Sequence, residues 1–283
     1  MSGQYKVAWL CEALLVSRSG YYDWVERRRR PGPRQVESAR LRARIRDEFA
    51  RSHQTYGSPR LAHALGCPGR RNRIARLMRA ERLFARQRSK YRVRTTDSSH
   101  SGPIAPNRLQ NLNVRRPDQV WTTDATGILT GQGWLYLVAV LDVCSRRVVG
   151  WAMHQSLDTR LVSAALRMAL LQRRPRTGLI LHSDRGSQFA SAAYRQILAQ
   201  HGLVASMSRK GNCYDNAFIE SFWSSLKYEV VYHRRFATLA DARHAIFHYI
   251  ETFYNRTRLH SSLAYRSPFA FESQPNPTLQ ISP

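Results

Sequence analysis

The chain has few cysteines and no long apolar run, and each shortage excludes a class of protein. Four cysteines in 283 residues, with no CxxC pair, argue against a disulfide scaffold and against a structural zinc site. We expect reduced thiols, as in cytosolic proteins. No apolar segment approaches the roughly 20 residues that span a bilayer, and no charged-then-apolar leader opens the chain. These absences predict a soluble, cytoplasmic protein with no membrane partner.

Acidic residues are also scarce, and their shortage leaves a large positive charge. The chain holds 19 Asp and Glu against 45 Lys and Arg, which gives a net charge of +26 and a pI near 11.2. Residues 1–100 alone hold 24 basic and 8 acidic residues, a net charge of +16. Such a charge attracts polyanions, because phosphate contacts release counterions. The first third is therefore the strongest candidate for docking on a nucleic-acid backbone.

The first hundred residues are predicted to be helical. Residues 5–24 indicate a helix, a turn and a second short helix, a pair that either reads DNA as a helix-turn-helix or simply packs. Residues 26–34, ERRRRPGPR, are predicted to be a basic linker, because prolines and glycine break helices. Three more helices are expected within 38–52, from Pro59 in 56–65, and within 71–84. Residues 86–107 are expected to form a second basic linker.

Three arginines of the 71–84 segment repeat every third residue. Arg73, Arg76 and Arg79 would share one side of a helix whose other side carries the apolar residues. A solvated charged face is the simple interpretation of such spacing. Because the region is so basic, we favour a face that contacts DNA phosphates.

From Gln119 onward the pattern changes to alternating strands and helices. Residues 120–129 and two runs within 134–154 are predicted to be antiparallel strands, with SRR as the turn. The remaining expected elements are a helix at 158–173, a strand at 178–184, a helix at 191–202, a strand at 204–209 and a helix at 216–232. The order βββαβαβα is that of an α/β, RNase H-like core with a five-stranded mixed sheet and flanking helices. We expect a linker at 101–117, this core at 118–235 and a C-terminal helical extension at 236–283.

Three carboxylates occupy places that this fold brings to one edge of the sheet. Asp124 lies in the first strand, Asp184 follows the fourth, and Glu220 lies on the last helix, with 59 and 35 residues between successive members. Carboxylates that meet in one cleft repel one another unless a cation lies among them, and oxygen ligands select Mg²⁺ or Mn²⁺. Two such ions about 4 Å apart suit in-line phosphoryl displacement. With the basic charge, this indicates a polynucleotide substrate.

Several other polar residues have both a functional and a structural interpretation. Asp142 is either a fourth carboxylate or, as we favour, an anchor for a strand end. His182 either assists a metal or water or, as we favour, forms a structural hydrogen bond. Asp215 and Asn216 are expected to cap the helix that follows. A last set near the end of the chain either packs the final helix on the core or touches DNA; its members are Tyr254, Asn255, Arg256, Arg258 and His260.

At these residues the sequence resembles the integrase-core DDE transposases of bacterial insertion sequences. The similar product is the one encoded by the second of two overlapping reading frames. The resemblance covers nearly the whole chain and includes QTYGSPRL, VWTTDAT, LDVCSRRVVGW, HSDRGSQF, SMSRKGNCYDNAFIESFWSSLKYE and YIETFYNRTRLHSSLAYRSPFAFE. The combination of HSDRGSQF with SRKGNCYDNAFIESF is highly specific. Gly127 departs from the pattern, because the family usually has an aromatic residue there.

The resemblance implies roles for individual residues. Asp124, Asp184 and Glu220 would be the catalytic, metal-binding triad for two Mg²⁺ ions, with Mn²⁺ as a substitute. Lys227, seven residues after Glu220, would lie near the DNA backbone at the active site, with an exposed, solvated lysine as the alternative. Arg209 and Lys210, in the SRKGN motif, are further candidate DNA contacts.

The resulting hypothesis is a transposase that cleaves and joins DNA strands at the ends of its own element. Double-stranded DNA, as element ends and as target, would be its partner, in the bacterial nucleoid. The resemblance also implies that a segment from the upstream frame is normally fused ahead of Met1, and we expect a homo-oligomer on DNA. Two alternatives stay open at this point: an RNase H-like nuclease without strand transfer, and a non-catalytic DNA-binding inhibitor of transposition.

Overall fold

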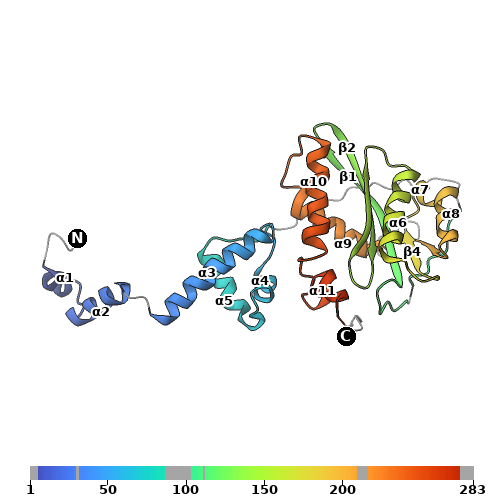
Figure 1. The fold of residues 1–283 in the computed structure, drawn as a ribbon. Coiled ribbons are helices and arrows are strands. Elements are labelled where there is room, and N and C mark those ends of the chain that lie inside the picture. Colours follow the sequence, from blue (N-terminus) through green and yellow to red (C-terminus); the bar gives the residue numbers. More distant parts are fainter. Residues whose placement is uncertain (1–5, 30–31, 87–102, 111, 209–215, 275–283) are drawn as a thin grey trace. The chain divides into compact units, whose positions relative to one another are not determined.

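The structure, a computed structural model, describes residues 6–29, 32–86, 103–110, 112–208 and 216–274. Its contacts divide the chain into two compact units, residues 1–86 and 87–283 (Figure 1). Among the described residues, no helix combines the length and the apolar character needed to cross a membrane. The predicted domain boundaries near residues 100, 117 and 235 stay predictions.

The first unit is helical, as predicted. Its helices are α1 (Val7–Ala13), α2 (Arg18–Arg29), α3 (Pro33–Arg51), α4 (Ser58–Ala64) and α5 (Arg71–Ala80), with a 3₁₀ turn at Pro68–Arg70. Helices α3, α4 and α5 pack together through apolar side chains at helical spacing. The buried set is Leu41, Ile45, Phe49, Leu61, Ile74, Leu77 and Met78. This three-helix group is the part of the unit with a true core.

The predicted linker at 26–34 is wrong at both of its ends. Helix α2 continues to Arg29, and α3 already begins at Pro33, five residues before the predicted helix. Proline is tolerated in the first helical turn, because the N–H that it lacks would have no partner there. Proline therefore opens α3 where the sequence pattern had been interpreted as a break.

The second unit is built on the mixed five-stranded sheet that the sequence predicts. Its strands are β1 (Val120–Thr130), β2 (Gly133–Asp142), β3 (Val148–His154), β4 (Ile180–Ser183) and β5 (Val204–Met207). The spatial order is β3-β2-β1-β4-β5. Strands β1, β2 and β3 pair antiparallel, whereas β1–β4 and β4–β5 pair parallel. The short β4 pairs only with the first residues of the long β1, Val120 to Thr122.

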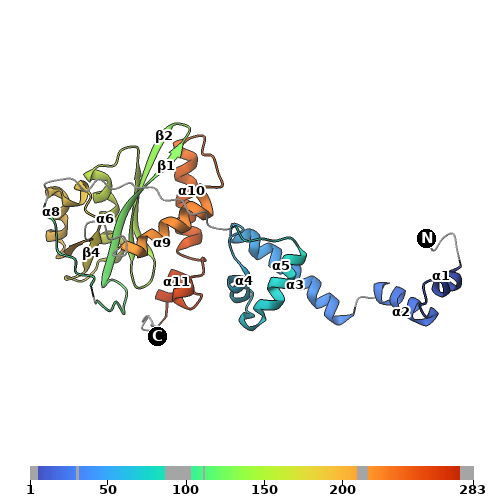
Figure 2. The same ribbon diagram turned by 180° about the vertical axis from the view of Figure 1, so that it is seen from behind.

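Helices cover both faces of this sheet (Figures 1 and 2). One face carries α6 (Thr159–Arg173), α7 (Ser187–Ala190) and α8 (Ala192–Gln200); the other carries α9 (Ala217–Leu226) and α10 (Leu239–His248), and a short α11 (Pro268–Glu272) follows. Side chains cap four of these helices: Asp158 accepts from the backbone N–H of Leu161, Ser191 from Tyr194, Thr238 from Asp241, and Ser267 from Ala270. These caps explain why α6 and α8 begin within one residue of their predicted starts.

Among the described residues of this unit, two segments are π-helical, which the sequence pattern did not predict. The expected helix 216–232 is α-helical only to Leu226 and continues as the π-helix η3 (Lys227–Val231). Helix α10 likewise continues as the π-helix η4 (Tyr249–Tyr254). Such π segments are rare, and they occur frequently at functional sites.

Gly150 of β3 lies directly against α6, and this close approach gives a test of the packing. A Cβ at Gly150 would lie 2.4 Å from the Ala165 carbonyl oxygen and 2.6 Å from the Ala169 nitrogen, both backbone atoms. We expect Gly150→Ala to reduce the free energy of unfolding by about 3 kcal/mol, because the sheet and helix must separate. Denaturant titration would measure the loss.

Gly127→Ala is the matched control on the same sheet. A Cβ there would lie close to one side chain, the Trp134 ring, at 3.1 Å. The Tyr136 ring, at 3.7 Å, would be in ordinary van der Waals contact. The Trp134 side chain is 53% exposed and free to shift. We expect a change below about 1 kcal/mol. Equal losses for both variants would contradict this account of β3 packing.

Candidate functional site

Asp124 lies in the middle of β1, opposite Ala139 of β2, and its side chain is partly buried. Its Oδ2 accepts a hydrogen bond of 2.9 Å from Nε1 of Trp223 on α9. Burial first, and then the negative charges of Asp184 and Glu220, raise the pKa of Asp124 to about 7, although hydrogen bonds from Ala125 and Trp223 act in the opposite direction. The side chain therefore lies within the electrostatic reach of both other predicted carboxylates.

Asp184 is the first residue after β4, where the chain turns into α7. Its Oδ1 accepts a hydrogen bond of 2.9 Å from the backbone N–H of Gly186, so the carboxylate itself stabilises the turn. The Ser183 hydroxyl donates to the Asp184 carbonyl oxygen at 2.9 Å. Since β4 is parallel to β1, this turn lies beside the strand that carries Asp124.

Glu220 lies in the first turn of α9 and is exposed. The buried side of α9, with Ile219, Phe222 and Trp223, holds the helix against the core. Partial burial raises the pKa of Glu220. Its position near a helix N-terminus favours a negative charge. Three separate elements thus supply the three carboxylates.

The donor chemistry of these carboxylates suits a hard cation. All three supply only oxygen, and the neighbouring charges already oppose ionisation of Asp124, a cost that a cation would relieve. In the described part of the chain, no three His, Cys, Asp or Glu side chains form a closed metal-holding group. The fit therefore rests on donor type and mutual repulsion.

Lys227 is the first residue of η3 and is half-buried, so it is not the fully solvated lysine of the alternative interpretation. Burial lowers the pKa of Lys227, while the charge of Asp124 acts to raise it. The ammonium therefore lies within the electrostatic reach of Asp124. Its contact with DNA stays a prediction.

Trp223 is a site residue that the sequence analysis missed. It follows Glu220 by three residues, so both project from neighbouring faces of α9. Its indole N–H holds Asp124 in one orientation across 99 residues of sequence. One sequence signal could have indicated this role: Trp223, which has an N–H donor, lies at helical spacing from the carboxylate of Glu220.

His182 and Asp142 have structural roles, as favoured. His182 is fully buried, and its ring nitrogens lie 2.9 Å from Ser206 Oγ and 3.0 Å from Ser208 Oγ. Asp142 is also fully buried; it accepts hydrogen bonds from the backbone N–H groups of Asp118 (2.6 Å) and Ser145 (2.8 Å). It anchors the end of β2 and belongs to no carboxylate cluster near Asp124.

The expected cap at the start of α9 is wrong for Asn216. Its side chain makes no capping hydrogen bond; instead its Oδ1 accepts from the Thr122 hydroxyl of β1. A partner 94 residues away therefore competes successfully with the helix terminus. Asp215 lies outside the described residues.

The burial of Asp142 predicts a pH dependence of stability. Burial raises its pKa from 3.8 to about 6, so the folded chain binds this proton more tightly than the unfolded chain. This group therefore favours folding below about pH 4, and its contribution is lost as the pH rises to 6, by about 3 kcal/mol in total. Unfolding free energies measured from pH 4 to 7 should fall in the wild type. The fall should be smaller by about this amount in Asp142→Asn, which keeps only the contribution of groups such as Asp124, whose pKa is also raised, to about 7. A fall of equal size in the variant would contradict the assignment.

Four of the five C-terminal motif residues pack rather than face solvent. Tyr254, Asn255, Arg258 and His260 are buried, whereas Arg256 is exposed. The Asn255 side chain makes two hydrogen bonds of 3.0 Å to the backbone of Val148 on β3. Packing on the core therefore explains these four residues, and Arg256 alone keeps the DNA alternative.

Arg258 forms a buried ion pair that the sequence analysis also missed. Its Nη2 donates to Oε1 of Glu229 at 2.8 Å, its Nε donates to Oε2 at 2.9 Å, and both side chains are 3% exposed. Tyr249 donates to the same carboxylate at 2.8 Å, and Ser225 accepts from Arg258 at 3.0 Å. This network joins both π-helices to α9.

The predicted arginine face of α5 is divided by the structure. Arg73 Nη1 pairs with Glu37 of α3 at 2.9 Å, so this arginine joins two helices. Arg76 and Arg79 have no ion pair with a described residue. DNA contact by all three stays a prediction. Arg209 and Lys210, the other candidates, lie outside the described residues.

Known protein families match both units. Two integrase core domain models match residues 114–213 and 201–268, and an HTH-like domain model matches residues 37–91. The fold and these matches define an integrase-core protein with a DNA-binding HTH-like domain. The HTH-like match covers α3 to α5; reading of DNA by the earlier pair in residues 5–24 stays a prediction.

Individual relatives identify the family. The chain is 46% identical over 269 residues, covering 94% of it and 98% of the relative, to the insertion element IS600 uncharacterized 31 kDa protein of Shigella sonnei. It is 38% identical over 275 residues, covering 96% and 95%, to the transposase InsF for insertion sequence IS3A of Escherichia coli strain K12. The chain belongs to the IS3 family of insertion-sequence transposases.

One solved structure with a similar fold is the HTLV-2 integrase catalytic core domain in complex with magnesium. The identity is 14%, the TM-score is 0.42, and the match covers 54% of this chain and 95% of that chain. At this low similarity, the fold assignment rests on the sheet order and the family models instead.

Proposed function

We propose that this chain catalyses metal-dependent cleavage and transfer of DNA strands at the ends of its insertion sequence. The observation that carries the proposal is the placement of three carboxylates by neighbouring elements. Asp124 lies on β1, Asp184 follows the adjacent parallel strand β4, and Glu220 lies on α9, whose Trp223 donates a hydrogen bond to Asp124. In an IS3-family chain, these are the carboxylates of the HSDRGSQF and NAFIESF motifs and of the first strand. The HTH-like domain would hold the DNA.

We assign Asp124, Asp184 and Glu220 as the ligands of Mg²⁺, in two ions, with Mn²⁺ able to substitute. Such ions would activate the attacking oxygen and stabilise the leaving oxygen of an in-line displacement. Trp223 holds Asp124 in position through the Nε1–Oδ2 hydrogen bond. Lys227, within the electrostatic reach of Asp124, would contact a phosphate oxygen of the bound strand.

Two successive displacements account for the reaction. Water first attacks the phosphodiester at the element end, and the broken bond leaves a free 3′-hydroxyl. That hydroxyl then attacks a target phosphodiester, so one P–O bond forms as another breaks. Neither step needs a covalent enzyme–DNA intermediate, and no Ser or Tyr nucleophile is assigned. Because two element ends must be joined, the active form would be at least a dimer on DNA.

A strand-transfer assay tests the proposal. Purified chain with Mg²⁺ and a labelled, precleaved end carrying a free 3′-hydroxyl should give joined product. Nicking without joining would favour the RNase H-like nuclease, and tight binding with neither product would favour the non-catalytic inhibitor. A parallel reaction with EDTA should give no product, since the chemistry requires the divalent ion.

A further inference from the structure

A basic cavity lies where the parallel strands β1 and β4 begin, at the opposite end of β4 from Asp184. It has a volume of about 370 Å³, and its lining includes Arg116, Arg173, Arg174 and Arg176, with Asp118 as the one acidic residue. The cavity borders the residues that precede β1 and β4, whereas Asp184 follows β4. Gly178 of the lining and Asp184 are six residues apart, which corresponds to about 20 Å of extended chain.

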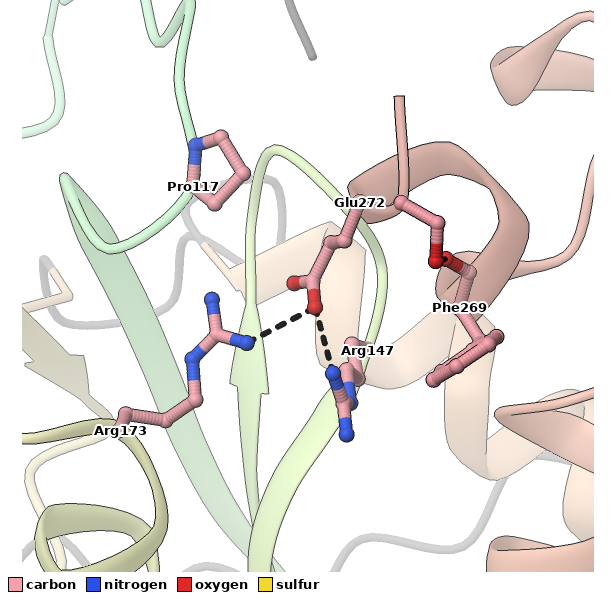
Figure 3. Close-up of a pocket in the computed structure, with 6 residues that line it drawn as sticks. Pro117, Arg147, Arg173, Phe269 and Glu272 are labelled. Carbon is pink, nitrogen blue, oxygen red and sulfur yellow. Dashed lines mark hydrogen bonds and ion pairs between the residues drawn. The ribbon is translucent and has the colours of Figure 1, made fainter. Parts of the chain in front are cut away.

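The floor of this cavity is fixed by a charge network that already satisfies one arginine. Arg173 donates to both carboxylate oxygens of Asp118 and, through Nη1, to Glu272 of α11 at 2.8 Å. Arg147 donates to the same Glu272 oxygen at 2.6 Å, in the adjoining cavity of about 450 Å³ (Figure 3). Trp121 also donates to Asp118, at 3.0 Å. These bonds hold the floor of the cavity in place.

The other three arginines of the lining are exposed. Among the described residues, none forms an ion pair with Arg116, Arg174 or Arg176. Arg174 ends α6 in the left-handed conformation (φ 45°), and Pro175 follows it, so the direction of the backbone is set by local geometry. The three guanidinium groups therefore border one concave surface at which positive charge is in excess.

We propose that this surface, formed by Arg116, Arg174 and Arg176, binds the phosphate backbone of duplex DNA at a place remote from the carboxylates. A guanidinium presents a planar fork of donors that matches phosphate oxygens. The inference rests on DNA being the substrate, as proposed above, and makes no use of the catalytic residues.

The test is equilibrium binding of a labelled duplex by the full chain over a series of salt concentrations. We expect the triple variant Arg116→Gln/Arg174→Gln/Arg176→Gln to bind duplex DNA more weakly. At about 0.1 M salt, the affinity should fall about tenfold for each phosphate contact that is lost. The slope of log K against log salt should fall by about 0.9 for each of these phosphates. The corresponding triple change to Lys should keep most of the slope, because the charge is retained.

The matched control removes three exposed arginines elsewhere in the same unit. Arg167→Gln/Arg195→Gln/Arg243→Gln alters α6, α8 and α10 by the same total charge. A smaller change in affinity and slope for this control supports the site. Equal losses in the two triple variants, or an unchanged slope in the first, would overturn it. Failure of strand transfer with this binding pattern intact would count against the proposed catalysis and not against this surface.

Discussion

Glu220→Gln is expected to reduce strand transfer at least about a hundredfold while DNA binding changes less than twofold. The substitution keeps the size of the side chain but removes the charge that would hold the metal, at a cost of roughly 3 kcal/mol or more in transition-state stabilisation. Glu220 is exposed and lies on the outer side of α9, so the fold should be unaffected. The measurement is the rate of joining of a precleaved end under saturating DNA.

Ser224→Ala is the control for this experiment. Ser224 lies one helical turn after Glu220 on α9 and is also exposed, so the change perturbs the same helix without removing a carboxylate. Its joining rate should stay within about twofold of the wild type. If Glu220→Gln joins ends as fast as Ser224→Ala does, the proposed metal-binding triad is wrong.

Arg258→Ala should destabilise the second unit by about 3–5 kcal/mol, because it leaves Glu229 charged and buried without its partner. A loss of this size corresponds to a fall in the midpoint of thermal unfolding on the order of 10 °C for a unit of this length. Differential scanning calorimetry and denaturant titration would measure it. The strand-transfer rate should fall in parallel with the folded fraction.

The double variant Glu229→Gln/Arg258→Met separates the charge from the packing. It removes both charges and keeps a similar side-chain volume. The amide oxygen at position 229 can still accept the hydrogen bond that Tyr249 donates. We expect most of the stability to return, since replacing a buried pair as a whole is often nearly neutral. A loss under about 1 kcal/mol for Arg258→Ala alone would contradict the role assigned to the ion pair.

Local patterns in the sequence were enough for the sheet and most helices of the second unit. The β-branched and aromatic runs predict strand β1 and the β2–β3 hairpin, and apolar residues at helical spacing predict α6. The order of elements then predicted the edge of the sheet at which Asp124 and Asp184 lie. These features depend on neighbours a few residues apart, which periodicity detects.

Features that depend on distant partners could not be predicted. The spacing of Arg73 on α5 did not reveal its ion-pair partner Glu37, which is 36 residues away on another helix. Asn216 prefers Thr122 to its own helix terminus. The π-helices likewise accompany the Glu229–Arg258 pair, which links positions 29 residues apart. In each case tertiary contacts outweigh a correct local preference.

The hydrogen bond between Trp223 and Asp124 has a consequence for synthesis of the protein. Its two residues are 99 positions apart, so strand β1 leaves the ribosome long before the helix that orients its carboxylate. Domains generally fold as units during synthesis, with the N-terminal one first. An unfinished or prematurely terminated chain would therefore present the basic HTH-like domain without the proposed cleavage centre. On the proposed function, such a fragment would bind DNA without cleaving it.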